Sequence, residues 1–359
     1  MQLNEINQNE RIVFLDYLRV IACFMVIMVH SCEFFFIDGE SIGIRSVSDG
    51  FWVSVIDSAF RSSVPLFVMA SSYLLLPLNG SVEEFFRSRF VRVVIPFIIW
   101  SLLYAVLPWS WGEITPEAVQ SNLLQLLSNF NAASGHLWFV YMLIGLYLFM
   151  PVLSPWLKGV SRRGERCFLL LWFLITFWHY AKLMVGDAYG ECYWNEFHTF
   201  WYFSGFIGYL VLAHYIRVYI DWSVRKSLLI GGVLFLTGYV FMATVYYHRT
   251  FTAQQLQELE FSWRFCSFNV VFMTAGVFVM MKKITKGRKW LYGIVKEISR
   301  LSYGIYLMHI FLLGFSYRLF EGCFSTPVTI VLVGISTFMG CCLLTKLLSY
   351  LPRSKYLVG

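Results

Sequence analysis

About ten apolar runs, each long enough to cross a lipid bilayer as a helix, recur along the 359-residue chain. A transmembrane helix needs about 20 mainly apolar residues, and in lipid only helices and closed barrels satisfy their own backbone polar groups. The runs lie at about 12–36, 58–78, 91–111, 136–156, 167–185, 197–215, 227–247, 266–282, 301–320 and 326–350. They predict an all-α fold, a polytopic membrane helical bundle with about ten transmembrane helices.

The amino-acid composition favours a membrane protein over a nucleic-acid-binding one. Hydrophobic residues make up 58% of the chain and charged residues 14%, whereas soluble domains average about 45–50% and about 25%. The net charge of +7 comes from short basic clusters between apolar runs rather than from one basic face, so we expect membrane lipid and not nucleic acid as a partner. The eight cysteines show no metal-ligand spacing, and we expect no metal site.

The distribution of Lys and Arg predicts the orientation of the bundle. With the N-terminus in the cytoplasm, the inner segments hold twenty of these residues and the outer segments six, as the positive-inside rule requires. Both termini are then cytoplasmic, as a short N-terminal segment at 1–11 and a short tail at 352–359. Because no soluble domain interrupts the runs, residues 1–359 are expected to form a single multi-pass domain in the cell (inner) membrane.

The first apolar run carries four ionisable residues: Asp16, Arg19, His30 and Glu33. An ionisable side chain inside a span is costly and is by default a sign of function. Arg19 and His30 are eleven positions apart, so on a helix they differ by only about 20° around the axis but by about 16 Å along it. The two side chains therefore lie on one face of the helix but cannot touch. We expect them to act at different depths of one channel along that face.

The spacing within this helix also suggests a partner for each of the two residues. Asp16 precedes Arg19 by three positions and can pair with it as a structural partner. Glu33 lies one turn beyond His30, and an imidazole oriented by a carboxylate is suited to take a proton from a hydroxyl group. The alternative is structural: an Asp16–Arg19 ion pair near the membrane interface, and a His30 that only bonds a neighbouring helix.

Five segments carry motifs in this order: DYLRVIACFMVIMVH, RSSVPLFVMASSYLL, FFRSRFVRVVIPFIIWSLLY, HLWFVYMLIGLYLFMPVL and ISRLSYGIYLMHIFLL. The first places ten residues between Arg19 and His30, and the third contains Arg89-x-x-Arg92. The ordered set, which extends over most of the chain, resembles the motifs of acyltransferase family three, a family of integral membrane O-acyltransferases.

The resemblance implies a reaction and roles for four residues. The family transfers an acyl group, here expected to be acetyl, from cytoplasmic acyl-CoA to a hydroxyl group of a cell-envelope glycan or lipid-linked saccharide. His30 is then the expected general base, and Arg19 belongs to the same catalytic set. Glu33 is added to this set from its spacing alone, as the carboxylate that orients His30. Arg89 and Arg92 match an essential motif of the family, and together with Arg19 they are expected to bind the phosphates or the arm of coenzyme A.

Other motif positions are expected to bind the acceptor substrate: Arg61, Ser71, His136, Trp138 and His309. The run that begins at Arg61 is most similar to the enterobacterial common antigen O-acetyltransferase type. The sequence departs from the family at the end of the second motif, where Ser72 replaces the glycine that usually follows the serine.

A different class of function also places charged residues on the helix faces of a membrane bundle. A transporter or flippase of an amphipathic or lipid-linked solute would do so, usually with inverted repeats and broken helices. The sequence shows neither clearly, which favours the enzyme. Consumption of a thioester that depends on His30 would distinguish the enzyme from a transporter.

Overall fold

The computed structural model describes residues 11–126, 132–185 and 203–359. Within these ranges, eight helices are long and apolar enough to cross a membrane, and a ninth span results if the bent pair Leu256–Trp263 and Phe268–Met281 is counted as one. The prediction of an all-α polytopic bundle is therefore confirmed. The expected span at 197–215 begins outside the described residues. Most of the expected N-terminal segment at 1–11 also lies outside them.

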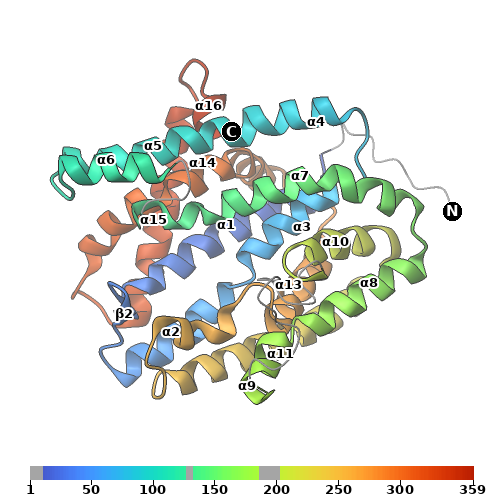
Figure 1. Cartoon of the computed structure of the whole chain (residues 1–359), viewed down its shortest axis with the longest axis horizontal. Helices are drawn as coiled ribbons and strands as arrows, with labels where there is room; N and C mark the ends of the chain where they lie inside the picture. Colours follow the sequence, from blue (N-terminus) through green and yellow to red (C-terminus); the bar gives the residue numbers. More distant parts are fainter. Residues whose placement is uncertain (1–10, 127–131, 186–202) are drawn as a thin grey trace.

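The element order is helical almost throughout (Figure 1). The helices are α1 (Val13–Glu33), α2 (Val47–Phe60), α3 (Ser63–Leu75), α4 (Val82–Arg89), α5 (Ile95–Ser110), α6 (Pro116–Gln125), α7 (Trp138–Gly159), α8 (Arg162–Ile175), α9 (Trp178–Val185), α10 (Ile207–Tyr219), α11 (Val224–Arg249), α12 (Leu256–Leu259), α13 (Phe268–Met281), α14 (Lys289–Phe320), α15 (Thr326–Leu348) and α16 (Lys355–Val358). Among the described residues, three short helical turns have other geometries: the π-helix η1 (Phe90–Val94) and the 3₁₀ turns η2 (Ala132–Leu137) and η4 (Glu260–Trp263). The strands β1 (Ile37–Asp38) and β2 (Ser41–Ile42) form a small antiparallel hairpin.

Helix α1 is the central element of the bundle. It packs against α14, α3, α15 and α2, and Figure 1 shows it among these helices. Its buried residues occur on most sides of the helix, as expected for a helix surrounded by others. The helix that carries the four ionisable residues is thus enclosed by protein over most of its surface.

The chain after α15 folds back onto the bundle rather than extending as a free tail. The indole Nε1 of Trp100 in α5 donates a hydrogen bond of 2.8 Å to the carbonyl of Leu357, and Val358 is buried. The expected tail at 352–359 therefore contains the short helix α16, which packs near α5, η1 and α14.

Helices α11 and α13 approach each other closely where two glycines meet. A Cβ atom added to Gly276 would lie 2.4 Å from the carbonyl oxygen of Gly231, a distance that real Cβ atoms do not reach. Small residues allow this backbone approach between membrane helices. The neighbouring Gly232 faces open space instead.

We expect Gly276→Ala to lower the free energy of unfolding by about 1–3 kcal/mol, because the added methyl group forces the two backbones apart. Gly232→Ala is the matched control and should have the opposite sign, since alanine favours a helix by up to about 1 kcal/mol over glycine. Unfolding in mixed micelles, followed by tryptophan fluorescence, measures both. Equal effects of the two substitutions would contradict the close approach.

Candidate active site

Three histidines that lie far apart in the sequence meet in the bundle. His30 comes from the end of α1, His136 from η2 and His309 from α14. The ring centroids of His30 and His309 are 5.1 Å apart, and those of His136 and His309 are 5.0 Å apart. We call these residues the histidine cluster. In the described ranges, no group of three or more His, Cys, Asp or Glu side chains is arranged to hold a metal ion.

His30 has a carboxylate partner one helical turn away. Its Nδ1 lies 2.8 Å from Oε1 of Glu33, and the two side chains are 19% and 35% exposed. A carboxylate accepts hydrogen bonds, so the neutral ring carries its proton on Nδ1 and presents the lone pair of Nε2. This arrangement orients an imidazole for proton abstraction and stabilises the imidazolium that forms. The contact has the geometry that is expected if Glu33 orients the His30 ring. The catalytic role of Glu33 stays a prediction.

Tyr306 of helix α14 contacts both of the other histidines. The hydroxyl of Tyr306 donates to the carbonyl of His136 at 2.5 Å, and Nδ1 of His309 donates to the carbonyl of Tyr306 at 2.5 Å. The hydroxyl of Tyr104 in α5 donates to the carbonyl of Leu307 at 2.9 Å. His136 and His309 were predicted separately as substrate-binding residues. The structure brings them together and buries both, at 7% and 0% exposure.

Arg61, predicted to bind substrate, is a buried residue held by protein groups. Its guanidinium donates to both carboxylate oxygens of Asp57 and lies 3.9 Å from the ring centroid of Trp263. Glu260 in η4 interacts electrostatically with Arg61, Glu33 and His30. The sequence analysis missed Asp57, Trp263 and Glu260 as neighbours of this site. The spacing of Asp57 and Arg61, one turn apart, was the available signal.

Asp16 and Arg19 interact electrostatically but do not form the predicted ion pair. The carboxylate of Asp16 accepts hydrogen bonds from Arg11 at 2.7 and 3.0 Å, and two groups of α14 occupy it further: Tyr292 at 2.9 Å and Ser299 at 2.7 Å. No hydrogen bond or ion pair joins Asp16 to Arg19 among the described residues. Asp16 is therefore a structural partner of Arg11 and α14.

Arg19 is half-buried and lies within electrostatic range of several residues. After Asp16, these include Tyr147 in α7 and Arg89. Arg89, the last residue of α4, donates to Oγ of Ser88 at 3.2 Å, and its guanidinium is 5.8 Å from the ring centroid of Tyr147. Its buried Nε has no partner. Arg19 and Arg89 thus lie within electrostatic range of each other.

Arg92 and Arg89 have different surroundings, although the two belong to one motif. The helix adopts π geometry over Phe90–Val94, a feature often found at functional sites. Arg92 is exposed and lines an open cleft of about 740 Å³, whereas Arg89 is not among the lining residues. In α14, Tyr303 supports the π turn by donating to the carbonyl of Val93 at 2.9 Å.

The cleft beside the π turn is rich in cations, and we call it the basic cleft. Its lining residues are Glu84, Arg87, Ser88, Val91, Arg92, Arg300, Lys355 and Gly359. Four of these side chains are cationic and one is anionic. Guanidinium and ammonium groups that converge on an open cleft favour phosphate or carboxylate ligands. Sequence reasoning found only Arg92, because Arg300 and Lys355 reach the cleft through tertiary packing.

Two other predicted substrate-binding residues lie away from the histidine cluster. Trp138 stacks on Phe265, with ring centroids 5.4 Å apart, and also contacts Phe206. Ser71 is half-buried in α3. Its neighbour Ser72, which stands in place of the family's glycine, is fully buried and donates to the carbonyl of Leu210 at 2.6 Å. This serine ties α3 to α10.

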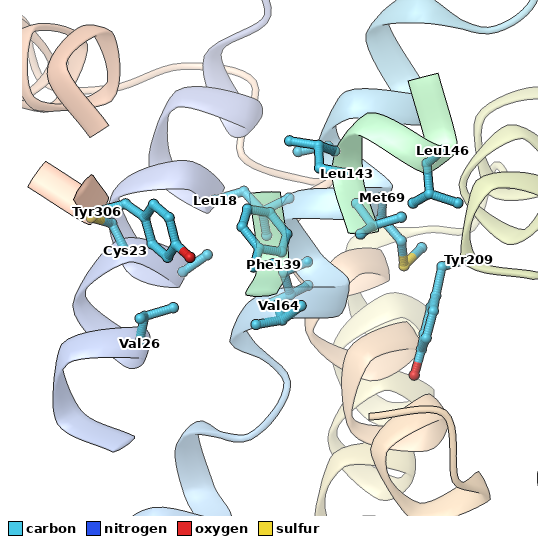
Figure 2. Close-up of a cluster of buried hydrophobic side chains, with 14 of the residues drawn as sticks. Leu18, Cys23, Val26, Val64, Met69, Phe139, Leu143, Leu146, Tyr209 and Tyr306 are labelled. Atoms are coloured by element: carbon cyan, nitrogen blue, oxygen red, sulfur yellow. The ribbon is translucent and has the colours of Figure 1, made fainter. Parts of the chain in front are cut away.

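The helix face between Arg19 and His30 is packed with side chains. Cys23 and Val26 occupy it and are 1% and 5% exposed. Figure 2 shows both in the same buried cluster as Tyr306. The face of α1 between Arg19 and His30 is therefore turned toward protein rather than lipid. A joint role of these two residues in the reaction requires this orientation. The shared channel expected along this face is filled by these side chains in this structure.

The fold and the site define a polytopic helical membrane protein with a carboxylate-oriented histidine and, separate from it, a cationic cleft. A family model described as an acyltransferase domain matches residues 12–346, and the chain belongs to acyltransferase family 3. The protein is therefore a membrane acyltransferase, which disfavours the transporter interpretation. Comparison with curated proteins and with solved structures finds no match.

Proposed function

We propose that the protein transfers an acetyl group from acetyl-CoA to a hydroxyl group of an envelope glycan or lipid-linked saccharide in the inner membrane of the cell. The observation that carries this proposal is the His30–Glu33 contact of 2.8 Å in a chain of acyltransferase family 3. A general base that is mostly buried but still reachable, and that is oriented by a carboxylate, suits a hydroxyl acceptor.

The proposed chemistry uses Nε2 of His30. This atom takes the proton of the acceptor hydroxyl while the oxygen attacks the thioester carbonyl carbon. Glu33 stabilises the resulting imidazolium through the hydrogen bond to Nδ1. As the tetrahedral intermediate collapses, the carbon–sulfur bond breaks and the thiolate of coenzyme A receives the proton. The products are the O-acetyl ester and free coenzyme A.

The basic cleft supports coenzyme A as the carrier of the donor. Coenzyme A bears several phosphate oxygens, and the cleft offers Arg87, Arg92, Arg300 and Lys355. The excess of Lys and Arg on the expected inner side agrees with a cytoplasmic location for this cleft. Arg89 and Arg19 lie deeper and would contact the arm of the cofactor. The thioester reaches His30 only if the packing of Cys23 and Val26 against their neighbours rearranges.

Two single substitutions in the cleft test the cofactor site. Arg92→Gln and Lys355→Gln are each expected to raise the Kd of coenzyme A about 10–100-fold, because each removes a charge-assisted contact with phosphate. Isothermal titration of the protein in nanodiscs measures the Kd. Lys158→Gln is the control, since Lys158 is exposed and does not line the cleft. Equal Kd values for all three variants would place the donor elsewhere.

The proposed reaction is tested in cells and in vesicles. Envelope glycans from cells with the protein, without it and with His30→Ala are compared by mass spectrometry, and purified protein in vesicles is assayed for release of coenzyme A from acetyl-CoA. We expect acetylated glycan only with the intact protein. Glycans that are alike in all three strains would overturn the proposal, and solute movement without thioester consumption would favour a transporter.

A further inference from the structure

Helix α16 packs where a glycine of α14 leaves room for it. A Cβ atom added to Gly304 would lie 2.9 Å from Cβ and 3.1 Å from Cα of Val358, whose side chain is buried. The first of these distances is shorter than real Cβ atoms show. A residue without a Cβ therefore allows α16 to approach α14 this closely. Figure 1 shows α16 beside α5 and α14.

The same packing brings α16 to the π turn that carries Arg92. Gly359 follows α16, and a Cβ atom on it would lie 2.7 Å from Cδ1 of Tyr303 and 3.1 Å from the carbonyl oxygen of Arg92. Tyr303 in turn donates to the carbonyl of Val93 within the π turn. The docked position of α16 is thus continuous with one wall of the basic cleft, and Lys355 of α16 lines that cleft.

Two features make α16 dependent on these contacts. A helix of four residues is not stable on its own, because it has too few hydrogen bonds to offset the cost of nucleation. Arg353, which precedes α16, has a φ angle of 61°. A non-glycine residue in this left-handed region costs free energy, which the surrounding contacts must offset. We therefore expect this segment to open more readily than the long helices.

The charge of the basic cleft links the position of α16 to a ligand. The cations of the cleft come from four different elements, α4, η1, α14 and α16: Arg87, Arg92, Arg300 and Lys355. They outnumber Glu84, the acidic residue of the lining. Like charges repel, so these cations oppose the docking of α16 unless an anion lies between them. A ligand with phosphate groups removes the repulsion and bridges Lys355 to the cations of the other elements.

We propose that α16 is a movable wall of the donor site, and that Gly304 and Val358 are positioning residues that hold it in place. This role rests on the proposed function, because it takes coenzyme A as the ligand of the basic cleft. With α16 docked, Lys355 contacts the phosphates of coenzyme A. The bound phosphates in turn keep α16 docked, since a ligand that binds one of two conformations more tightly also stabilises it.

Cleavage by trypsin after Lys355, followed by mass spectrometry of the full chain in nanodiscs, measures how often α16 leaves its docked position. A protease cuts only where the chain opens locally. We expect Val358→Asn and Gly304→Ala to speed this cleavage about tenfold. Gly293→Ala is the matched control on α14 and should leave the rate unchanged, because nothing lies within 4 Å of the added methyl group. Val358→Asn alters neither α14 nor α15, whereas Gly304→Ala also presses on Thr345.

The ligand supplies the second part of the test. Saturating coenzyme A should slow cleavage after Lys355 about tenfold, whereas pantetheine, which lacks the phosphates, should not. Reciprocally, Val358→Asn should raise the Kd of coenzyme A about 10–100-fold, as Lys355→Gln does. The double variant should raise the Kd no further, because a released α16 no longer presents its lysine. If Val358 acted independently of Lys355, the two effects on the Kd would multiply instead.

The movable wall and the proposed function fail in distinguishable ways. Inorganic pyrophosphate is the second probe, and protection by pyrophosphate but not by coenzyme A would keep the movable wall and remove coenzyme A as the donor. If neither ligand slows the cleavage, the movable wall is wrong, although acyl transfer that depends on His30 would still support the proposed function. A Val358→Asn variant that does not fold is recognised from its elution profile and is replaced by Val358→Thr, which has nearly the shape of valine.

Discussion

Replacing His30 with glutamine is expected to lower the rate of acyl transfer by about 10²–10⁴-fold, the usual contribution of a general base. The glutamine side chain fills similar space near Glu33 but cannot take a proton from the acceptor hydroxyl. Binding of acetyl-CoA should stay unchanged, because the basic cleft at Arg92 and Lys355 does not include His30. Release of coenzyme A in vesicles measures the first quantity, and isothermal titration the second.

Glu33→Gln extends this experiment to the carboxylate. It keeps the shape of the side chain but removes the charge that stabilises the imidazolium, so turnover should fall by less than in His30→Gln. His248→Gln serves as the control for loss of a histidine outside the site. Turnover in His30→Gln within a factor of about ten of the unaltered protein would contradict the general-base role.

The largest expected effect on stability comes from Asp57→Ala. It leaves the buried guanidinium of Arg61 without its counter-ion, and breaking a buried pair in this way typically costs about 3–5 kcal/mol. The double variant Asp57→Ala/Arg61→Leu should recover most of the loss, because it removes the uncompensated charge as well. The free energy of unfolding in mixed micelles is the measurement, with yield from membranes as a second readout.

An exposed ion pair supplies the comparison. Asp221 interacts with Lys283 at 3.3 Å, and its side chain is fully exposed. Exposed pairs contribute little because water screens them, so Asp221→Ala should leave the unfolding curve nearly unchanged. Similar losses for Asp57→Ala and Asp221→Ala would show that the burial of the Asp57–Arg61 pair has no energetic consequence.

The lengths of the apolar runs predicted the membrane bundle correctly, but they did not predict where several of its helices begin. Helix α4 begins at Val82, well before the expected span at 91–111. The Ser81 hydroxyl accepts from the backbone N–H of Glu84 at 3.1 Å, an N-cap that starts a helix in polar sequence. Helix α2 likewise begins after the N-cap Ser46. The length of an apolar run does not show where a helix begins in the polar sequence before it, whereas an N-cap residue does.

Local spacing predicted the part of the site that lies on one helix. His30 and Glu33 are one turn apart, so their contact could be expected without a structure. The contact of His30 with His309 depends instead on how α1 packs against α14, and no spacing in the sequence encodes that distance. The same holds for Arg300 and Lys355 beside Arg92. The hydrogen bonds from Tyr292 and Ser299 to Asp16 could not be predicted either, because both residues belong to a distant helix.

Helix α14 is one uninterrupted rod of 32 residues. Arg300 in the basic cleft and His309 in the histidine cluster are nine residues apart on it, or about 13 Å. A rigid rod moves as one body, so a tilt of α14 at the basic cleft would also displace the His309 ring that packs against His30. If the proposed donor tilts α14 when it binds in the basic cleft, the helix itself carries that movement to the histidine cluster.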